Sequence, residues 1–262
     1  MKKLKKKETT ISLFKDLKPI ALNDLLAEIH SCTMALPAFT RDFDWEPITT
    51  QHMITAIANN YPAARCLLRV RDANGLFAAR EFKGAPKLEG QKHTFLVLDG
   101  QQCLTSLYQA FYGVGKHRYY LNLRKLIDGS GFEEAIFHVR ASTKWVKEHE
   151  TFDMQAKELT LPLSVLKGGL GEFRHWVRRA VRRLSDKGPT ALEDTLYVVE
   201  EKWLKTIEDY HFPIITLTGE IEPDTLSDIF QSVSRTDVKL SRKELEYVLK
   251  VSKSADFLQP LL

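Results

Sequence analysis

The hydrophobic pattern changes its period clearly between residues 95 and 113. Residues Phe95–Leu98 form a short uninterrupted apolar run, which is typical of a buried strand. After Asp99-Gly100 the apolar side chains recur at helical spacing until Gly113, at Leu104, Leu107, Tyr108, Phe111 and Tyr112. This pattern predicts a strand, a tight turn and a helix, around which the rest of the chain is organised.

The polar residues of this turn are candidates for binding an anion. Asp99 can cap the first free N–H groups of the helix, and Gly100 allows another group to approach the backbone closely. The free N–H groups and the helix dipole would face the anion, with Gln101 and Gln102 at the mouth of the turn. The alternative is a purely structural turn, because a strand followed by an Asp-capped helix is common.

Shorter patterns on both sides of the turn predict further strands and helices. Residues 66–70 and an apolar run at residues 212–217 predict strands, and the alternation of apolar and polar residues predicts another at 118–123. Helical periodicity predicts one helix capped by Asn23 and others at residues 50–59, 172–185, 192–210, 223–233 and 242–250. Residues 36–47 are rich in proline and aromatic residues, which indicates an ordered loop held to the core by its aromatic side chains.

These elements predict an α+β fold in which a mixed sheet is packed by helices. We expect residues 1–10 to be a disordered basic arm and residues 11–127 to be the first part of the main domain. Residues 128–210 are expected to be a helical insertion or subdomain. Residues 211–262 then return as the closing strand and helices of the same domain.

The segment 172–185 carries the strongest amphipathic pattern of the chain. An apolar stripe runs from Phe173 to Leu184, and five arginines fill the other faces, at Arg174, Arg178, Arg179, Arg182 and Arg183. Arginines opposite an apolar stripe most often form a solvated face. The other interpretation is a surface that follows the phosphates of DNA, with Arg174, Arg178 and Arg182 along one flank.

Composition and charge restrict the class of protein only in part. The chain has 262 residues and is 44% hydrophobic, which is enough for a sizeable core. Five of its 38 lysines and arginines lie at residues 2–7, and the remaining 33 balance the 34 acidic residues, so the net charge of +4 comes from the arm. The three cysteines form no C-x-x-C pair, and no long apolar run is present, which favours a cytoplasmic protein without membrane spans.

The string LDGQQ-x-LTSLY at residues 98–108 resembles the D-G-Q-Q-R and L-T-[ST]-L signature of the GmrSD-type family of restriction and phage-defence proteins. The loop at residues 36–47 is similar to that family's I-P-x-[FY]-Q-R-x-[FY]-x-W motif, although Thr40 replaces the glutamine. The segment at residues 230–245 resembles a third motif of the family but has Ser232, Ser234 and Asp237 at its polar positions. The resemblance implies a fold related to the ParB and sulfiredoxin superfamily, with a degenerate motif.

The resemblance also implies roles for the residues of these motifs. Asp99, Gly100, Gln101 and Gln102 would bind a nucleoside triphosphate, with Asp99 holding Mg²⁺ and the glutamines orienting phosphate oxygens or an attacking water. Arg41 would face the same cleft as Asp99, whereas the alternative is an Arg41 bound to a carbonyl or a surface carboxylate. Phe39, Thr40 and Arg41 would contact DNA together with Arg174, Arg178 and Arg182.

Cys103 stands where the family has the arginine of D-G-Q-Q-R. An arginine in that place would neutralise the charge that develops on the transferred phosphoryl group, and its loss typically reduces the rate by a factor on the order of 10³–10⁵. A reactive thiol near a helix N-terminus is one interpretation of Cys103, and a small buried hydrophobic residue is the other.

The sequence therefore predicts a DNA-associated regulatory domain of a restriction or phage-defence system that binds nucleotide and hydrolyses it weakly or not at all. The alternative is a non-enzymatic DNA-binding or protein-interaction module with a relic nucleotide site. The eight histidines form no nuclease motif, so we expect a nuclease in a partner or in a further region of a longer protein. A homo- or hetero-oligomer remains an open alternative.

Overall fold

The computed structural model describes residues 14–63, 67–72, 75, 77–184, 191–217 and 229. The expected basic arm at residues 1–10 and the expected helices at residues 223–233 and 242–250 lie outside this part, apart from residue 229. The elements are β1 (Phe14–Ala21), α1 (Leu22–His30), β2 (Met34–Pro37), α2 (Pro47–Ala58), β3 (Leu67–Arg71), β4 (Ala79–Arg80), β5 (Phe95–Asp99), α3 (Gln101–Tyr112), β6 (His117–Asn122), α4 (Leu123–Ile127), α5 (Phe132–Ala135), β7 (Ile136–Arg140), α6 (Lys144–His149), α7 (Phe152–Glu158), β8 (Thr160–Pro162), the 3₁₀ helix η1 (Leu163–Gly168), α8 (Leu170–Leu184), α9 (Ala191–Val199), the π-helical turn η2 (Glu200–Leu204), α10 (Lys205–Glu208) and β9 (His211–Leu217).

The larger sheet has six strands in the order β1-β9-β3-β5-β2-β4. β9 pairs antiparallel with β1 and parallel with β3, so the closing strand lies inside the sheet. β5 lies between antiparallel β3 and parallel β2, and β4 adds a short antiparallel edge. The predicted α+β fold with a mixed sheet is confirmed.

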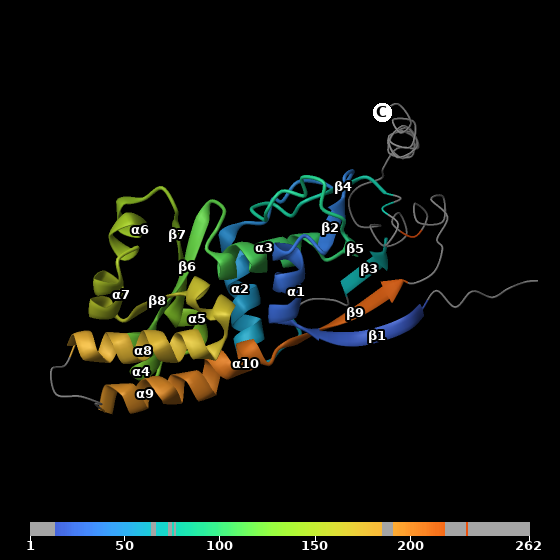
Figure 1. The fold of residues 1–262 in the computed structure, drawn as a ribbon. Coiled ribbons are helices and arrows are strands. Elements are labelled where there is room, and N and C mark those ends of the chain that lie inside the picture. Colours follow the sequence, from blue (N-terminus) through green and yellow to red (C-terminus); the bar gives the residue numbers. More distant parts are fainter. Residues whose placement is uncertain are drawn as a thin grey trace, which may run out of the picture.

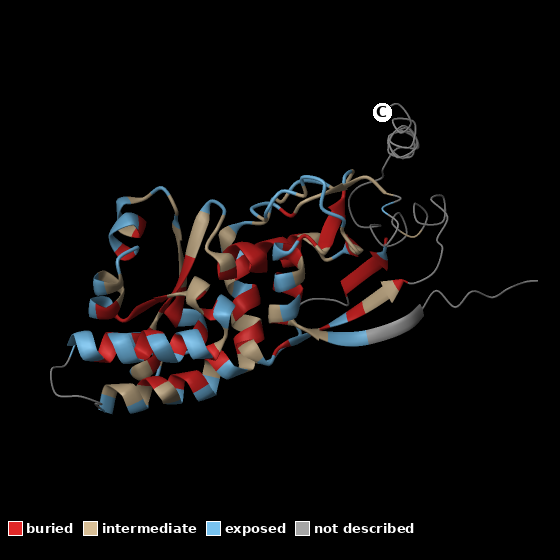
Figure 2. Cartoon of the chain, viewed as in Figure 1, coloured by how far each residue is buried: buried red, intermediate tan, exposed pale blue. Residues whose placement is uncertain are grey.

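Helices α1, α2 and α3 lie between the larger sheet and a second, three-stranded sheet (Figure 1). The second sheet has the antiparallel order β7-β6-β8. Val97 of β5 joins the main core with these helices, whereas its neighbours Leu96 and Leu98 join a smaller cluster on the other face of the larger sheet. β5 is thus buried on both faces, which explains its uninterrupted apolar run (Figure 2).

The predicted central unit is confirmed as β5 followed by α3, and α8 and β9 match the predicted helix and strand closely. The predicted cap at Asn23 is wrong, because α1 begins at Leu22 with Ala21 as its N-cap and no side-chain hydrogen bond there. The region 128–210, which we expected to be helical, also contains β7 and β8, which pair with β6. The division of the chain into domains stays a prediction.

Candidate functional site

The turn between β5 and α3 has a backbone that requires glycine. Gly100 has φ +103°, in the left-handed region, and serves as the N-cap of α3. A Cβ atom on Gly100 would overlap Cδ2 of Leu67 on the neighbouring strand β3. Any side chain here would therefore strain the backbone and force the side chain of Leu67 to move.

The start of α3 presents free backbone donors, but Asp99 does not cap them as predicted. The Asp99 carboxylate accepts the N–H of Gly100 at 2.8 Å, and the first helical bond runs from the N–H of Leu104 to the carbonyl of Gly100 at 2.9 Å. The N–H groups of residues 101–103 precede this bond and have no acceptor inside the helix. Asp99 itself is exposed, so an exposed carboxylate lies beside a helix N-terminus with three unused donors.

Both glutamines of the turn bind the backbone of the loop at residues 38–46. The side chain of Gln102 donates to the carbonyl of Asp42 at 2.9 Å and accepts the N–H of Asp44 at 3.1 Å. Gln101 donates to the carbonyl of Arg41 at 2.5 Å. The two motifs that lie about sixty residues apart in the sequence are thereby joined at the start of α3.

Arg80 holds the same loop from its other side and was not singled out in the sequence. Its guanidinium, on the edge strand β4, donates to the carbonyls of Thr40 at 3.0 Å and Arg41 at 2.7 Å. It lies in a stretch with no hydrophobic period, so only the carbonyls it contacts reveal its role. A cation beside the loop therefore remains near the start of α3 even though α3 lacks an arginine.

The side chains of the loop divide between packing and solvent. Phe39 packs against the smaller apolar cluster, Trp45 packs against the main core, and the hydroxyl of Thr40 donates to the carbonyl of Pro37 at 2.9 Å. The Arg41 guanidinium is half exposed and lies 3.8 Å from the carboxylate of Asp44, which is the surface-carboxylate arrangement expected as the alternative. The backbone of Arg41 thus belongs to the site, while its side chain pairs within the loop.

Cys103 is a buried thiol in the core. Its sulfur lies 3.5 Å from the sulfur of Met53 on α2, and the residue is only 5% exposed. Burial, and secondarily the charge of Asp99, raises the pKa of this thiol to about 12. Its environment therefore favours the interpretation of a small buried hydrophobic residue over a reactive thiol.

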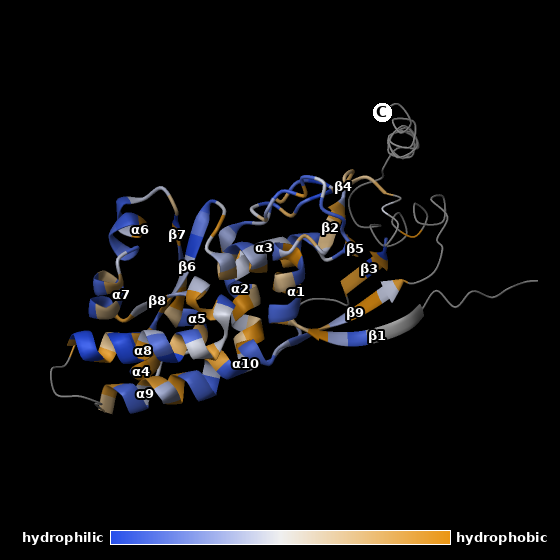
Figure 3. Ribbon diagram, in the orientation of Figure 1, coloured by the Kyte–Doolittle hydropathy of each residue, from blue (hydrophilic) through white to orange (hydrophobic). Residues whose placement is uncertain are grey.

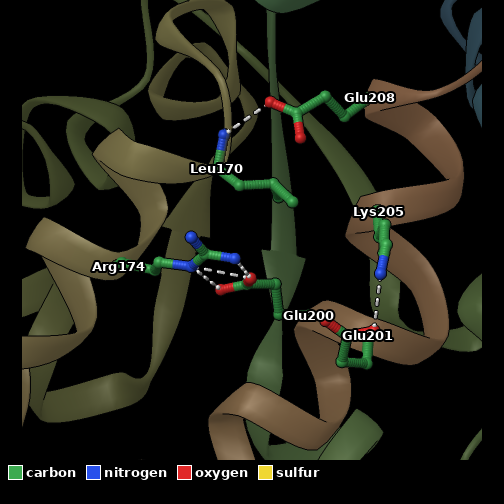
Figure 4. Close-up of polar contacts among 6 residues, drawn as sticks. All are labelled: Leu170, Arg174, Glu200, Glu201, Lys205 and Glu208. Atoms are coloured by element: carbon green, nitrogen blue, oxygen red, sulfur yellow. Dashed lines mark hydrogen bonds and ion pairs between the residues drawn. The ribbon is translucent and has the colours of Figure 1, made fainter.

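Helix α8 combines a buried apolar stripe with an exposed basic face, as Figure 3 shows by hydropathy. Three of its arginines have partners on neighbouring helices. Arg174 binds the buried carboxylate of Glu200 through Nε at 2.8 Å and through Nη2 (Figure 4). Arg183 pairs with the carboxylate of Asp153 at 3.0 Å. The guanidinium of Arg179 lies 3.9 Å from the centroid of the Phe152 ring. Arg178 and Arg182 are exposed and have no hydrogen bond or ion pair with any described residue.

The partner of Arg174, Glu200, lies at the start of a π-helical turn. Glu200 begins the π-helical turn η2 and is 2% exposed, while the following Glu201 points outward to Lys205 at 3.0 Å. Glu208 of α10 accepts the N–H of Leu170 at 2.9 Å and so caps the start of α8 (Figure 4). These contacts assign Arg174 to the packing of α8 against the following helices.

The described residues contain no group of three or more histidine, cysteine, aspartate or glutamate side chains arranged to hold a metal ion. Asp99 would therefore contribute to a Mg²⁺ site only together with phosphate oxygens and water. Among the described helices, none is both long and apolar enough to cross a membrane.

A comparison with protein families matches residues 22–246 to the N-terminal domain of the GmrSD restriction endonuclease. This match covers most of the chain and includes the loop, the turn and α8. The chain belongs to the GmrSD N-terminal domain family. An uncharacterised protein of Methanocaldococcus jannaschii is 24% identical over 243 residues, and the match covers 86% of this chain and 40% of that protein.

Membership of the GmrSD family associates the chain with restriction systems. The chain spans less than half of its curated relative, so that relative has further regions outside the similarity. Within the GmrSD motif, the turn keeps Asp99, Gly100, Gln101 and Gln102, and Cys103 is the departure. The third motif, with Ser232, Ser234 and Asp237, lies outside the described residues.

Proposed function

We propose that this GmrSD-type chain is a regulatory domain of a DNA-acting restriction or phage-defence system in the cytoplasm. In this proposal it binds a nucleoside triphosphate with Mg²⁺ at the start of α3 and hydrolyses it slowly or not at all. A partner or a further region of a longer protein supplies the nuclease. The observation that supports the proposal is the set of three unused N–H donors beside the exposed carboxylate of Asp99.

The donors and the carboxylate suit different parts of the same ligand. Backbone N–H groups at a helix N-terminus bind phosphate oxygens, and those of residues 101–103 have no acceptor inside α3. A carboxylate next to these phosphates can share a Mg²⁺ ion with them, directly or through water. Gln101 and Gln102 are bound to the loop, so their part in the proposal is to fix the loop over the nucleotide and, after a local rearrangement, to orient phosphate oxygens.

Slow hydrolysis follows from the side chain at position 103. The thiol of Cys103 is neutral and points to Met53, so it cannot neutralise charge on a phosphoryl group. Arg80 of β4 is a cation beside the loop, but its Nη2 group is engaged with the carbonyls of Thr40 and Arg41. A nucleotide that is bound but hydrolysed slowly would act as a regulatory ligand and would not supply free energy to the system.

Thermal unfolding with each of the four ribonucleoside triphosphates and Mg²⁺ tests the binding. A ligand at a hundred times its Kd stabilises the folded state by about 2.7 kcal/mol, so at least one nucleotide is expected to raise the melting temperature in a concentration-dependent way. Asp99→Asn should reduce this shift, whereas Asp128→Asn, an equal change of charge at the exposed C-cap of α4, should not. Absence of any shift at millimolar nucleotide would refute the proposal.

Phosphate release before and after replacement of Cys103 tests the hydrolysis. We expect little release from the parent protein. Because Met53 occupies the space beside residue 103, the arginine is best restored together with more room, as Cys103→Arg combined with Met53→Ala. Recovery of release in this variant, with retained folding, would show that the rest of the site is competent.

The second candidate function is a DNA-binding or protein-interaction module in which the turn only holds the loop. The engagement of both amide atoms of Gln102 favours it, because a glutamine that binds the backbone twice already has a structural role. This candidate predicts no nucleotide-dependent shift at all.

Any DNA affinity is expected to lie on Arg178 and Arg182, the two arginines of α8 that have no hydrogen bond or ion pair with a described residue. Removing one arginine–phosphate interaction should reduce the salt slope of binding by about one, with little change in sequence preference. The double variant Arg178→Ala/Arg182→Ala should bind all duplexes more weakly and with a flatter salt dependence. If it binds as the parent does across a salt titration, the basic face of α8 is only solvated.

A further inference from the structure

The outer face of the three-stranded sheet carries a pocket of about 560 Å³ that none of the family motifs contributes to. Leu121 of β6 and Ile136 of β7 are paired and point into the main core, so their neighbours point the opposite way. The pocket lies on this outward face, where α6 and α7 each contribute one lining residue. These two helices lie at one end of the molecule (Figure 1). Its lining residues are Asn122, Lys125, Glu134, Phe137, Val139, Trp145, Glu158 and Thr160.

The floor and one wall of the pocket are apolar and largely aromatic. Phe137 and Val139 of β7 lie on the floor, and Trp145 of α6 forms the wall. The ring centroids of Phe137 and Trp145 are 5.6 Å apart at an interplanar angle of 75°, and Trp145 stacks on His149 at 3.6 Å. The ring of Trp145 is therefore held in a fixed orientation, with one of its faces covered by His149.

Several polar groups of the pocket have unused hydrogen-bonding capacity. Thr160 is buried as a residue, but its hydroxyl has no partner among the described residues and is not one of their fully buried polar atoms, so it is open to the pocket. The side-chain oxygen of Asn122 accepts the N–H of Lys125 at 3.1 Å, which leaves its NH₂ group free. The carboxylate of Glu134 also has no partner in the described part of the chain.

The charges of the pocket nearly cancel. The ammonium of Lys125 donates to the carbonyl of Glu134 at 2.9 Å, so one cation and one carboxylate lie on the same rim. The second carboxylate, on Glu158, is 2.7 Å from Nε2 of His149, whose Nδ1 is 2.8 Å from the carbonyl of Trp145. Two carboxylates against a single lysine do not suit a phosphate group, and a ligand that is neutral fits better.

We propose that this pocket binds a nucleobase, the planar nitrogen heterocycle of a nucleoside, that carries an exocyclic amino group. The base would lie against the apolar side chains of Phe137, Val139 and Trp145, and its edge would use the hydroxyl of Thr160 and the NH₂ of Asn122. The amino group would donate to the carboxylate of Glu134. The base comes from a free nucleoside or from single-stranded nucleic acid, since both present the same edge and faces.

Nucleosides test this proposal separately from the nucleotide site, because they lack the phosphates that the start of α3 would bind. We expect cytidine and adenosine to change the fluorescence of Trp145 on binding, and uridine and inosine, which lack the amino group, to bind more weakly. Thr160→Val keeps the shape of the side chain and should weaken binding about three- to ten-fold without lowering the melting temperature, because the hydroxyl contacts no described protein group.

Two further variants of exposed residues keep the test decisive. Glu134→Gln should reduce the preference for cytidine over uridine, and Lys144→Ala, outside the pocket on the same helix as Trp145, should leave the affinity unchanged. Competition by short single-stranded DNA distinguishes the source: tighter binding of the strand assigns the base to nucleic acid, and no competition assigns it to free nucleosides. Absence of nucleoside binding, equal affinity for cytidine and uridine, or an unchanged affinity in Thr160→Val would overturn the proposal.

Discussion

Replacing Gln102 by alanine should release the loop at residues 38–46 from the start of α3. The side chain of Gln102 is 7% exposed and makes two hydrogen bonds, to the carbonyl of Asp42 and from the N–H of Asp44. Each bond contributes roughly 0.5–1.5 kcal/mol net. The buried methylene group that alanine lacks contributes about 0.8 kcal/mol more.

The sum is about 2–3 kcal/mol, since Asp42 and Asp44 are exposed and water can replace part of these interactions. If the loop opens on its own, that free energy raises the population of the open form roughly 30- to 150-fold, because 1.4 kcal/mol corresponds to a factor of ten. If the loop instead unfolds with the domain, the melting temperature should fall by roughly 4–12 °C.

Trypsin cleavage after Arg41 measures the first outcome, and thermal unfolding measures the second. Cleavage of a transiently open loop follows the open population when opening and closing are fast. Gln101→Ala is the matched control, because it removes one hydrogen bond from a partly exposed side chain and should have a smaller effect. If Gln102→Ala leaves both the cleavage rate after Arg41 and the melting temperature unchanged, the amide contacts do not hold the loop.

The remaining predictions concern the packing of α8, the pH dependence of stability and the reactivity of one thiol. Arg174→Ala should lower the melting temperature clearly, because it leaves the buried carboxylate of Glu200 without its partner, whereas Arg178→Ala on the same helix should hardly change it. Burial lowers the pKa of His138 below its usual 6.5, so the unfolded chain binds a proton more readily than the folded protein. The contribution of His138 to stability should therefore be full above about pH 6.5 and fall below it. His138→Gln should flatten this fall in unfolding curves recorded from about pH 7.5 to 5. Cys103 should resist alkylation by iodoacetamide at pH 8 in the native protein and react once denaturant is added. Mass spectrometry of the peptide that contains Cys103 measures both reactions. Rapid labelling of the native protein would contradict the buried position of the thiol.

The features that the sequence predicted well depend on local signals. The change of hydrophobic period at Asp99-Gly100 marks β5 and α3 because both elements bury their own apolar residues next to the turn. The apolar stripe of α8 likewise lies within one helix. β8 was missed since it has three residues, too few to show a period of two, and exists through its pairing with β6 about forty residues earlier.

The roles of individual polar residues depend on partners that are distant in sequence. Gln102 looks like a free amide at a helix start, and only the fold brings the loop backbone, 58–60 residues away, onto both of its polar atoms. Arg174 looks the same as Arg178 on the helical repeat, yet the π-helical turn places Glu200 against the first and not the second. The sequence therefore predicts which surfaces are polar, and the fold decides which polar groups are already in use.

The position of β9 between β1 and β3 has a consequence for how the protein is made. On the ribosome, residues 14–21 emerge long before residues 211–217, and at about 5–20 residues per second the first strand waits roughly 10–40 s for its neighbour. Until then the edge of β3 that later binds β9 is also open, with unpaired N–H and C=O groups able to pair with another nascent chain. The larger sheet can close only late in synthesis, so its folding yield should depend on the rate of translation and on chaperones that shield that edge.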